Sequence, residues 1–256
     1  MTLRLAISNQ KGGTGKTTVA VNLAGALADR DRRVLLIDLD PQGYATEATG
    51  LADAYDADGV TLHDVLLDVD EQSAIGDVIQ SGNEFDVLPS NTSLAANNTE
   101  SALKQATGGE KRLGMALDEL DQDYDFVVVD CPPGLGALTD NALLACEHVV
   151  IPAEAKGTSM RAVELLSDQI ASLERFFDAD IAPVAVVANE ARPDGVSDEM
   201  LEWFERVFAD VPVFEIRKRV ALQRAMTAGV SIFEHDEDCD MEAVFDDLAA
   251  HLEGQR

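Results

Sequence analysis

The sequence predicts an α/β fold: a single domain with a mostly parallel sheet and helices on both faces of that sheet. Short apolar runs alternate with segments of helical periodicity along the chain, and no low-complexity linker interrupts them. Several runs are rich in β-branched residues, which is typical of strands buried on both faces of a parallel sheet. A chain of 256 residues can bury one sizeable core, so we assign residues 1–256 to one domain.

The first strand, loop and helix form the most informative segment. Apolar residues alternate over residues 3–7 as in a strand, and they recur at helical spacing over residues 19–27. The intervening loop reads Lys11-Gly12-Gly13-Thr14-Gly15-Lys16-Thr17-Thr18. Glycines let backbone N–H groups converge on phosphate oxygens, and the N-terminus of the following helix favours anions. The segment therefore predicts a phosphate-binding loop, with Gln10 where the general pattern has its first glycine.

Each polar residue of this loop has an expected role. Lys16 would neutralise the β- and γ-phosphates, and the Thr17 hydroxyl would bind magnesium. The residues expected to contact the nucleotide are Gly12, Gly13, Thr14, Gly15, Lys16, Thr17 and Thr18. The alternative is a glycine-rich turn that merely joins a strand to a helix, but such a turn needs neither two lysines nor two threonines in register.

The second predicted strand, residues 34–37, is an apolar run that ends in Asp38 and continues as Leu39-Asp40-Pro41-Gln42-Gly43. Open parallel sheets bind ligands at the carboxyl ends of their strands. We therefore expect Asp40 to position an attacking water and Asp38 to lie near the loop lysines and the magnesium ion. A plain strand-ending turn residue is the alternative for Asp38.

The third predicted strand, residues 126–129, is a β-branched run that ends in Asp130. Asp130 is expected to hold magnesium through a water, and residues 131–134 would form a switch that senses the γ-phosphate. Further buried strands are predicted over 147–152 and 183–189. Residues 51–82 are expected to be an aspartate-rich helical insertion that packs onto the body through Val60, Leu62, Val65, Leu66 and Leu67.

These motifs resemble the deviant Walker A ATPases, the ParA/MinD family, over nearly the whole chain, and ParA-type partitioning ATPases most closely. The resemblance implies an α/β P-loop NTPase fold with ATP and Mg²⁺ as cofactors. It also implies that Lys11 reaches across a two-fold interface to the nucleotide of the other subunit, so the ATP-bound form would be a homodimer. Asn189 would contact the adenine. Tyr44 stands where the family has asparagine.

The function that the resemblance implies is slow, partner-stimulated ATP hydrolysis by Lys11, Lys16 and Asp40, coupled to non-specific binding of double-stranded DNA. The partner would be a centromere-binding ParB-like protein, and the cargo a plasmid or chromosome. The densest basic cluster of the chain would contact DNA phosphates: Arg217, Lys218, Arg219 and Arg224. An exposed basic turn that neutralises nearby carboxylates, or a contact to the nucleotide base, remains open for these residues.

The sequence also allows functions other than DNA partitioning, both within the family and outside it. A MinD-like ATPase would grip the membrane with a C-terminal amphipathic helix, but the polar side of residues 241–252 is acidic, which favours packing onto the domain. We therefore expect no stable membrane association. A protein-cargo positioning ATPase, a nucleotide-locked scaffold and a dethiobiotin-synthetase-like ligase are the remaining alternatives; the scaffold would not need Asp40.

Composition and cysteine spacing bear on the source of the protein, its metal sites and its location. The formal charge is −29, and the acidic residues are scattered over every segment, which suggests a halophilic source. Cys131, Cys146 and Cys239 make no C-x-x-C pair, so neither a zinc nor an iron–sulfur site is expected. Because the chain contains neither a signal peptide nor an apolar stretch near twenty residues, we expect a cytoplasmic protein, and the resemblance to ParA-type ATPases implies that it is nucleoid-associated.

Overall fold

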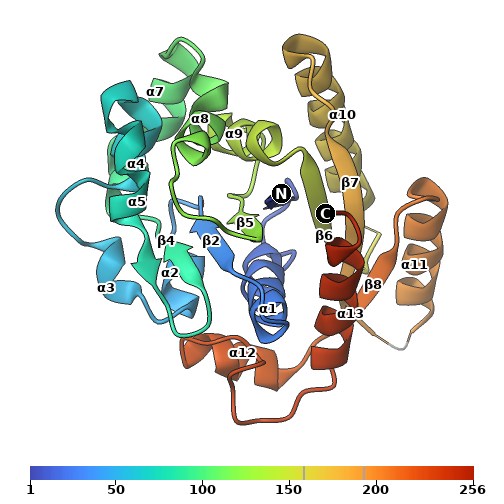
Figure 1. Ribbon diagram of the computed structural model, residues 1–256. Helices are drawn as coiled ribbons and strands as arrows, with labels where there is room; N and C mark the ends of the chain where they lie inside the picture. Colours follow the sequence, from blue (N-terminus) through green and yellow to red (C-terminus); the bar gives the residue numbers. More distant parts are fainter. Residues whose placement is uncertain (158, 193) are drawn as a thin grey trace.

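The computed structural model describes residues 1–157, 159–192 and 194–256, and its centre is an eight-stranded sheet (Figure 1). The strand order is β3-β4-β2-β5-β1-β6-β7-β8, and each neighbouring pair is parallel except β3 and β4. The strands are β1 (Leu3–Ile7), β2 (Val34–Asp38), β3 (Gln80–Ser81), β4 (Asp86–Leu88), β5 (Phe126–Asp130), β6 (His148–Glu154), β7 (Ala182–Ala191) and β8 (Val213–Arg217). The predicted fold class is confirmed, while the assignment of residues 1–256 to one domain stays a prediction.

Helices cover both faces of the sheet, so two apolar layers form (Figure 1). One layer holds α4 (Leu62–Leu67), α5 (Ile75–Val78), α6 (Thr92–Ala96), α7 (Thr99–Gln105), α8 (Arg112–Asp118), α9 (Ala137–Cys146), α10 (Ser159–Phe177) and α11 (Gly195–Val207). The other holds α1 (Lys16–Asp29), α2 (Tyr44–Ala48), α12 (Val220–Thr227) and α13 (Glu242–Glu253). The central strands β1, β2 and β5 are buried nearly throughout, which explains their continuous apolar runs.

Strand register brings the motifs to one edge of the sheet. Ile7 and Asp38 both pair with Asp130, so the loop after β1 and both strand-end carboxylates meet at the carboxyl end of the sheet. This is the edge at which open α/β sheets bind ligands.

The insertion-like region consists of short helices: α3 (Ala52–Tyr55), α4, the 3₁₀ turn η1 (Val69–Ala74) and α5. Leu62, Val65 and Leu66 are fully buried and Leu67 packs against the core, which confirms that part of the prediction. The expectation for Val60 is wrong, because this side chain is 44% exposed. Val60 precedes the N-cap Thr61, so it lies outside the helical periodicity that buries the others.

The C-terminal helix α13 packs on α1, as its acidic polar side predicted. Its apolar side is fully buried and consists of Phe245, Leu248, Ala249 and Leu252. Its carboxylates bind the arginines that follow α1: Glu253 pairs with Arg30 and Arg32, and Asp246 pairs with Arg30. Within the described ranges, none of the helices combines the length and apolar character that a membrane crossing requires.

Candidate active site

A cavity of about 660 Å³ opens at the carboxyl edge of the sheet, beside the phosphate-binding loop. Its walls come from the loop and α1, the segment around α2, Pro133, the end of β7 and α12. The lining residues are Gly12, Gly13, Gly15, Lys16, Thr17, Thr18, Asp40, Gln42, Tyr44, Glu47, Ala48, Pro133, Asn189, Glu190, Met226 and Thr227. The volume and the glycine-rich floor suit a nucleotide of ordinary size.

The loop backbone is shaped by left-handed glycines and held by Asn189. Gly15 is the N-cap of α1 with a φ of 88°, a conformation that favours glycine. The Asn189 amide donates to the Thr14 carbonyl at 3.0 Å, and a Cβ on Gly15 would collide with that amide. Asn189 thus lines the cavity from the loop side, as required for the predicted adenine contact, which stays a prediction.

Lys16 lies at the start of α1 and is 6% exposed. Its ammonium donates to the Lys11 carbonyl at 3.1 Å, so the Lys16 side chain bonds back to the start of the loop. Burial lowers the pKa of Lys16, and the nearby negative charges of Asp130 and Asp40 oppose that shift. A buried ammonium beside glycine N–H groups is suited to binding phosphate oxygens.

Thr17 and Asp130 meet as the sequence predicted for a magnesium site. The Thr17 hydroxyl donates to Asp130 Oδ2 at 2.7 Å, while Oδ1 of the same carboxylate is buried without a hydrogen-bond partner among the described residues. Burial raises the pKa of Asp130 well above its usual range, and the charge of Asp38 adds to the rise. An oxygen donor pair with one unsatisfied buried oxygen fits a hard divalent cation.

Asp38 holds the segment that follows it. Its Oδ2 accepts hydrogen bonds from both the backbone and the hydroxyl of Thr46, each at 2.7 Å, and Oδ1 accepts from the Asp40 N–H at 3.2 Å. The carboxylate therefore fixes the turn from β2 into α2. The magnesium role predicted for Asp38 stays a prediction.

Asp40 faces the cavity, unlike Asp38. The Gln42 N–H donates to its Oδ1 at 3.0 Å, and the side chain lines the wall near Lys16. Burial raises the pKa of Asp40, although the Gln42 hydrogen bond and the Lys16 charge partly offset this. Asp40 is thus placed where it could orient a water against a bound phosphate, as expected from its position after β2.

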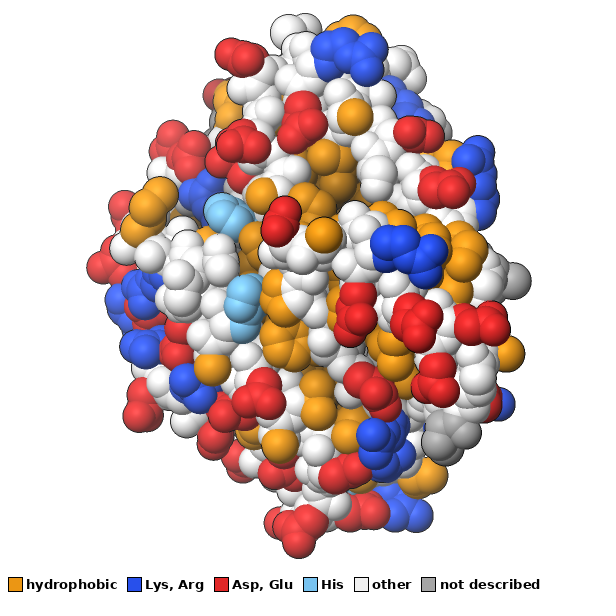
Figure 2. Space-filling model, turned by 90° about the vertical axis from the view of Figure 1, so that its right-hand side faces the viewer, with side chains coloured by type: hydrophobic (Ala, Val, Ile, Leu, Met, Phe, Trp, Pro, Cys, Tyr) orange, Lys and Arg blue, Asp and Glu red, His pale blue; other side chains and the backbone are white. Residues whose placement is uncertain are grey.

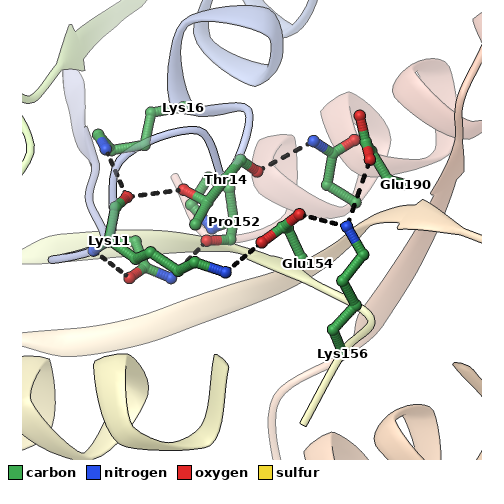
Figure 3. A network of polar contacts seen from close by, with 9 residues as sticks. Lys11, Thr14, Lys16, Pro152, Glu154, Lys156 and Glu190 are labelled. Carbon is green, nitrogen blue, oxygen red and sulfur yellow. Dashed lines mark hydrogen bonds and ion pairs between the residues drawn. The ribbon is translucent and has the colours of Figure 1, made fainter. Parts of the chain in front are cut away.

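The ammonium groups of the two loop lysines have different partners: Lys16 bonds the Lys11 carbonyl, whereas the Lys11 side chain extends to Glu154 (Figure 3). The Lys11 ammonium forms an ion pair with Glu154 at the end of β6. Glu154 also accepts from Lys156 at 2.6 Å, Lys156 lies 3.6 Å from Glu190, and Glu190 accepts from Lys218 at 3.1 Å. A line of alternating charges therefore runs from the loop to the basic cluster.

The basic cluster lies at the end of β8 and the start of α12, at the same sheet edge as the loop. Each of its four cations forms an ion pair with a carboxylate: Arg217 with Glu215, Lys218 with Glu190, Arg219 with Asp240 and Arg224 with Glu237. Exposed ion pairs of this kind contribute roughly 0–1 kcal/mol each, so phosphates could compete for these cations. Both expectations for the cluster, neutralising turn and DNA contact, are therefore compatible with its geometry.

Two residues of the site were missed by sequence reasoning. Glu154 ends a buried strand at the ligand-binding edge, which is the signal that singled out Asp38 and Asp130, so it could have been found. Thr46 contacts Asp38 from within a short helix, and nothing in its spacing marks it.

Replacing Asp38 with asparagine is expected to flatten the pH dependence of stability. Burial raises the pKa of Asp38 to about 7, so the folded state keeps a proton that the unfolded chain releases near pH 4. The folded state then binds more protons between about pH 4 and 7, and the free energy of unfolding falls as pH rises through that window. Asparagine cannot release a proton, so the fall in the free energy of unfolding over this window should become smaller.

Urea unfolding of the nucleotide-free chain between pH 4.5 and 7.5 measures this effect. The control is Asp58→Asn, because Asp58 is exposed. If Asp38→Asn and the unmodified chain lost stability with the same slope, the buried Asp38 carboxyl would not be the group that titrates.

Comparison with known proteins extends the similarity beyond the loop. A family model described as an AAA domain matches residues 3–182. The sporulation initiation inhibitor protein Soj of Bacillus subtilis is 35% identical over 253 residues, with 97% of both chains covered. The chromosome partitioning protein ParA of Myxococcus xanthus is 36% identical over 179 residues, covering 69% of this chain and 61% of that one. A structure of cobyrinic acid a,c-diamide synthase from Mycobacterium smegmatis with ADP and magnesium gives a TM-score of 0.80 at 30% identity, covering 100% and 97% of the two chains.

Proposed function

Because the chain belongs to the ParA/MinD family of deviant Walker A ATPases, we propose that it is a dimerising ATPase that binds non-specific DNA and drives partitioning of a plasmid or chromosome. The observation that carries this proposal is the arrangement of the two loop lysines. Lys16 lines the cavity, whereas the Lys11 ammonium is directed away from it, onto Glu154 (Figure 3). One lysine therefore suits the nucleotide of its own subunit, and the other suits the nucleotide of a second copy.

The residues at the cavity have different roles in ATP hydrolysis. Lys16 and the loop N–H groups bind the phosphates, and Asp40 accepts a hydrogen bond from the attacking water. Thr17 and, through a water, Asp130 would hold Mg²⁺, which would neutralise phosphate charge. Asn189, which lines the cavity beside the loop, would contact the adenine.

Dimerisation follows from Lys11. On closure of an ATP-bound homodimer, its ammonium would exchange Glu154 for the triphosphate of the partner, where it would stabilise the charge that develops during hydrolysis. Slow turnover is then expected until a partner protein favours this arrangement. A ParB-like protein with a basic segment would fit the acidic surface, on which carboxylates surround the fewer cations (Figure 2).

DNA binding is assigned to the basic cluster of Arg217, Lys218, Arg219 and Arg224. A dimer presents the cluster twice, which increases the number of phosphate contacts without raising the cost of association in proportion. The formal charge of −29 repels DNA at long range, and salt screens that repulsion while it also weakens each phosphate contact. Such a complex would place the protein on the nucleoid in the cytoplasm.

Combined Arg217→Ala, Lys218→Ala and Arg219→Ala replacement is expected to weaken ATP-dependent DNA binding by at least about tenfold, because three phosphate contacts per subunit are lost. Conversely, Asp240→Asn removes the carboxylate that pairs with Arg219 and should tighten binding about twofold or more. Binding to non-specific duplex DNA is measured with ATP, ADP and no nucleotide at several salt concentrations.

The control for charge is a triple alanine variant of Arg161, Arg175 and Arg206, which are exposed on α10 and α11. It removes the same charge from another surface and should bind DNA within about twofold of the unmodified chain. If ATP-dependent dimers formed but bound no DNA at any salt concentration, a positioning ATPase with a protein cargo or a nucleotide-locked scaffold would replace the present proposal. ATP turnover that is lost when Asp40 is replaced would favour the positioning ATPase, and the absence of turnover would favour the scaffold.

A further inference from the structure

Residues 131–136 join Asp130 to the N-terminus of α9 and contain the predicted switch, residues 131–134; we call this connection the switch segment. Its middle lies beside the phosphate-binding loop: Pro133 and Gly12 line the same cavity, and a Cβ added to Gly12 would come within 3.8 Å of the Pro133 Cβ. Its first end is fixed by β5 and by the Thr17 contact of Asp130. The position of the segment therefore depends on what holds its second end.

That second end is held by a carboxylate from another helix. The N-cap of α9 is Gly136, which has no side chain to bond the first N–H groups of the helix. Instead, Glu100 of α7 accepts from the Ala137 N–H at 2.6 Å and from the Leu138 N–H at 3.3 Å. A Cβ on Gly136 would collide with the Glu100 carboxylate, so glycine is what permits this close approach.

Glu100 is in turn fixed by its own helix. The preceding residue, Thr99, is fully buried, and its hydroxyl is 2.7 Å from Nδ1 of His63 on α4. The Thr139 hydroxyl adds a second tie within the switch, donating to the Gly134 carbonyl at 3.1 Å. The carboxylate is thus a fixed anchor, placed 37 residues before the N–H that it binds.

We infer that Glu100 is a positioning residue: its carboxylate holds the switch segment in the arrangement that recognises the γ-phosphate. The inference rests on the proposed function, because it concerns how that same site distinguishes ATP from ADP. A carboxylate that caps a helix N-terminus gains from both the N–H groups and the helix dipole. Without this carboxylate, the switch segment populates other arrangements. ATP binding must then shift the population back to the arrangement that recognises the γ-phosphate, and this lowers the affinity for ATP.

ADP has no γ-phosphate to contact the switch, so its binding depends on the loop, Lys16, the magnesium ligands and the base contact, and not on the position of the switch segment. Loss of Glu100 should therefore change the ratio of the two affinities rather than both affinities alike. A residue that merely stabilised the fold would lower the melting temperature and leave this ratio unchanged. The ATP-to-ADP ratio is the readout that separates the two roles.

The test measures dissociation constants for ADP and for an ATP analogue that is not hydrolysed, with Mg²⁺, for the unmodified chain, Glu100→Ala, Glu100→Gln and Glu119→Ala. Glu100→Ala should bind the ATP analogue about five- to tenfold more weakly and ADP within about twofold. Glu100→Gln keeps one acceptor oxygen and should fall between. Glu119 is exposed at the end of α8, so Glu119→Ala should match the unmodified chain.

An unchanged ratio in Glu100→Ala would overturn the inference, whatever happened to its melting temperature, as would equal losses for both nucleotides. If Glu100→Ala failed to fold, Glu100→Gln would decide, and an unchanged ratio in that variant would have the same meaning. An unmodified chain that bound neither nucleotide would overturn the proposed function itself, and the inference with it.

Discussion

Replacing Lys16 with alanine is expected to abolish measurable ATP binding, with a loss of affinity of at least about a hundredfold. The Lys16 ammonium is buried in the wall of the cavity, which Asp40 also lines, and the nearby charge of Asp130 acts on it as well. Its removal deletes charge-assisted hydrogen bonds to phosphate, which contribute roughly 1.5–3 kcal/mol each. It also leaves two buried carboxylates without a compensating cation, and these would repel a triphosphate.

Titration with a fluorescent ATP analogue measures this loss, and circular dichroism establishes that the variant is folded. The matched control is Lys104→Ala, because Lys104 is an exposed lysine on α7. It should bind ATP like the unmodified chain. A folded Lys16→Ala variant with affinity within about twofold of the unmodified chain would show that the loop binds phosphate without this residue.

Much of the fold was predictable because its signals are local. The β-branched runs over β2 and β5 are buried on both faces, so their apolar character is continuous and easily read. The loop between β1 and α1 favours glycine at positions such as Gly15, where φ is positive. The glycines in the sequence therefore indicate the backbone conformation of the loop. Val60 was misplaced because apolar character alone does not reveal that the N-cap Thr61 follows it and that the helix begins only at Leu62.

The candidate site was predictable only where a residue's place in the sheet determined its surroundings. Asp38, Asp40 and Asp130 follow buried parallel strands, so topology brings them to one edge. Contacts between distant segments had no such signal. Glu100 caps a helix in a different part of the chain, and in a sequence with 48 acidic residues nothing distinguishes that carboxylate from those that face solvent. Pairing of the basic cluster with carboxylates was one of the expectations, but the particular partners, such as Asp240 and Glu237, could not be identified for the same reason.

Replacing Lys11 with alanine is expected to leave the affinity of the monomer for nucleotide within about threefold of that of the unmodified chain. Turnover should fall at least about a thousandfold, because the variant loses a charge that is supplied in trans to the partner's nucleotide. The variant should fold, because Glu154 keeps its second partner, Lys156. Burial alone would raise the pKa of Glu154, but hydrogen bonds from Lys11 and Lys156 outweigh it and hold that pKa below its usual range. One lysine therefore remains to stabilise the carboxylate when the other is removed.

The same carboxylate supplies the control. Lys156→Ala also removes one of the two lysines on Glu154, but from a residue outside the loop, so ATP-dependent dimerisation and turnover should persist. Analytical ultracentrifugation with ATP and with ADP reports dimerisation, and phosphate release reports turnover. If Lys11→Ala formed ATP-dependent dimers and hydrolysed ATP at the unmodified rate, its ion pair with Glu154 would be a structural contact and the trans role would be wrong. If both lysine variants lost turnover equally, the loss would come from the disturbed Glu154 and not from a charge delivered to a partner nucleotide.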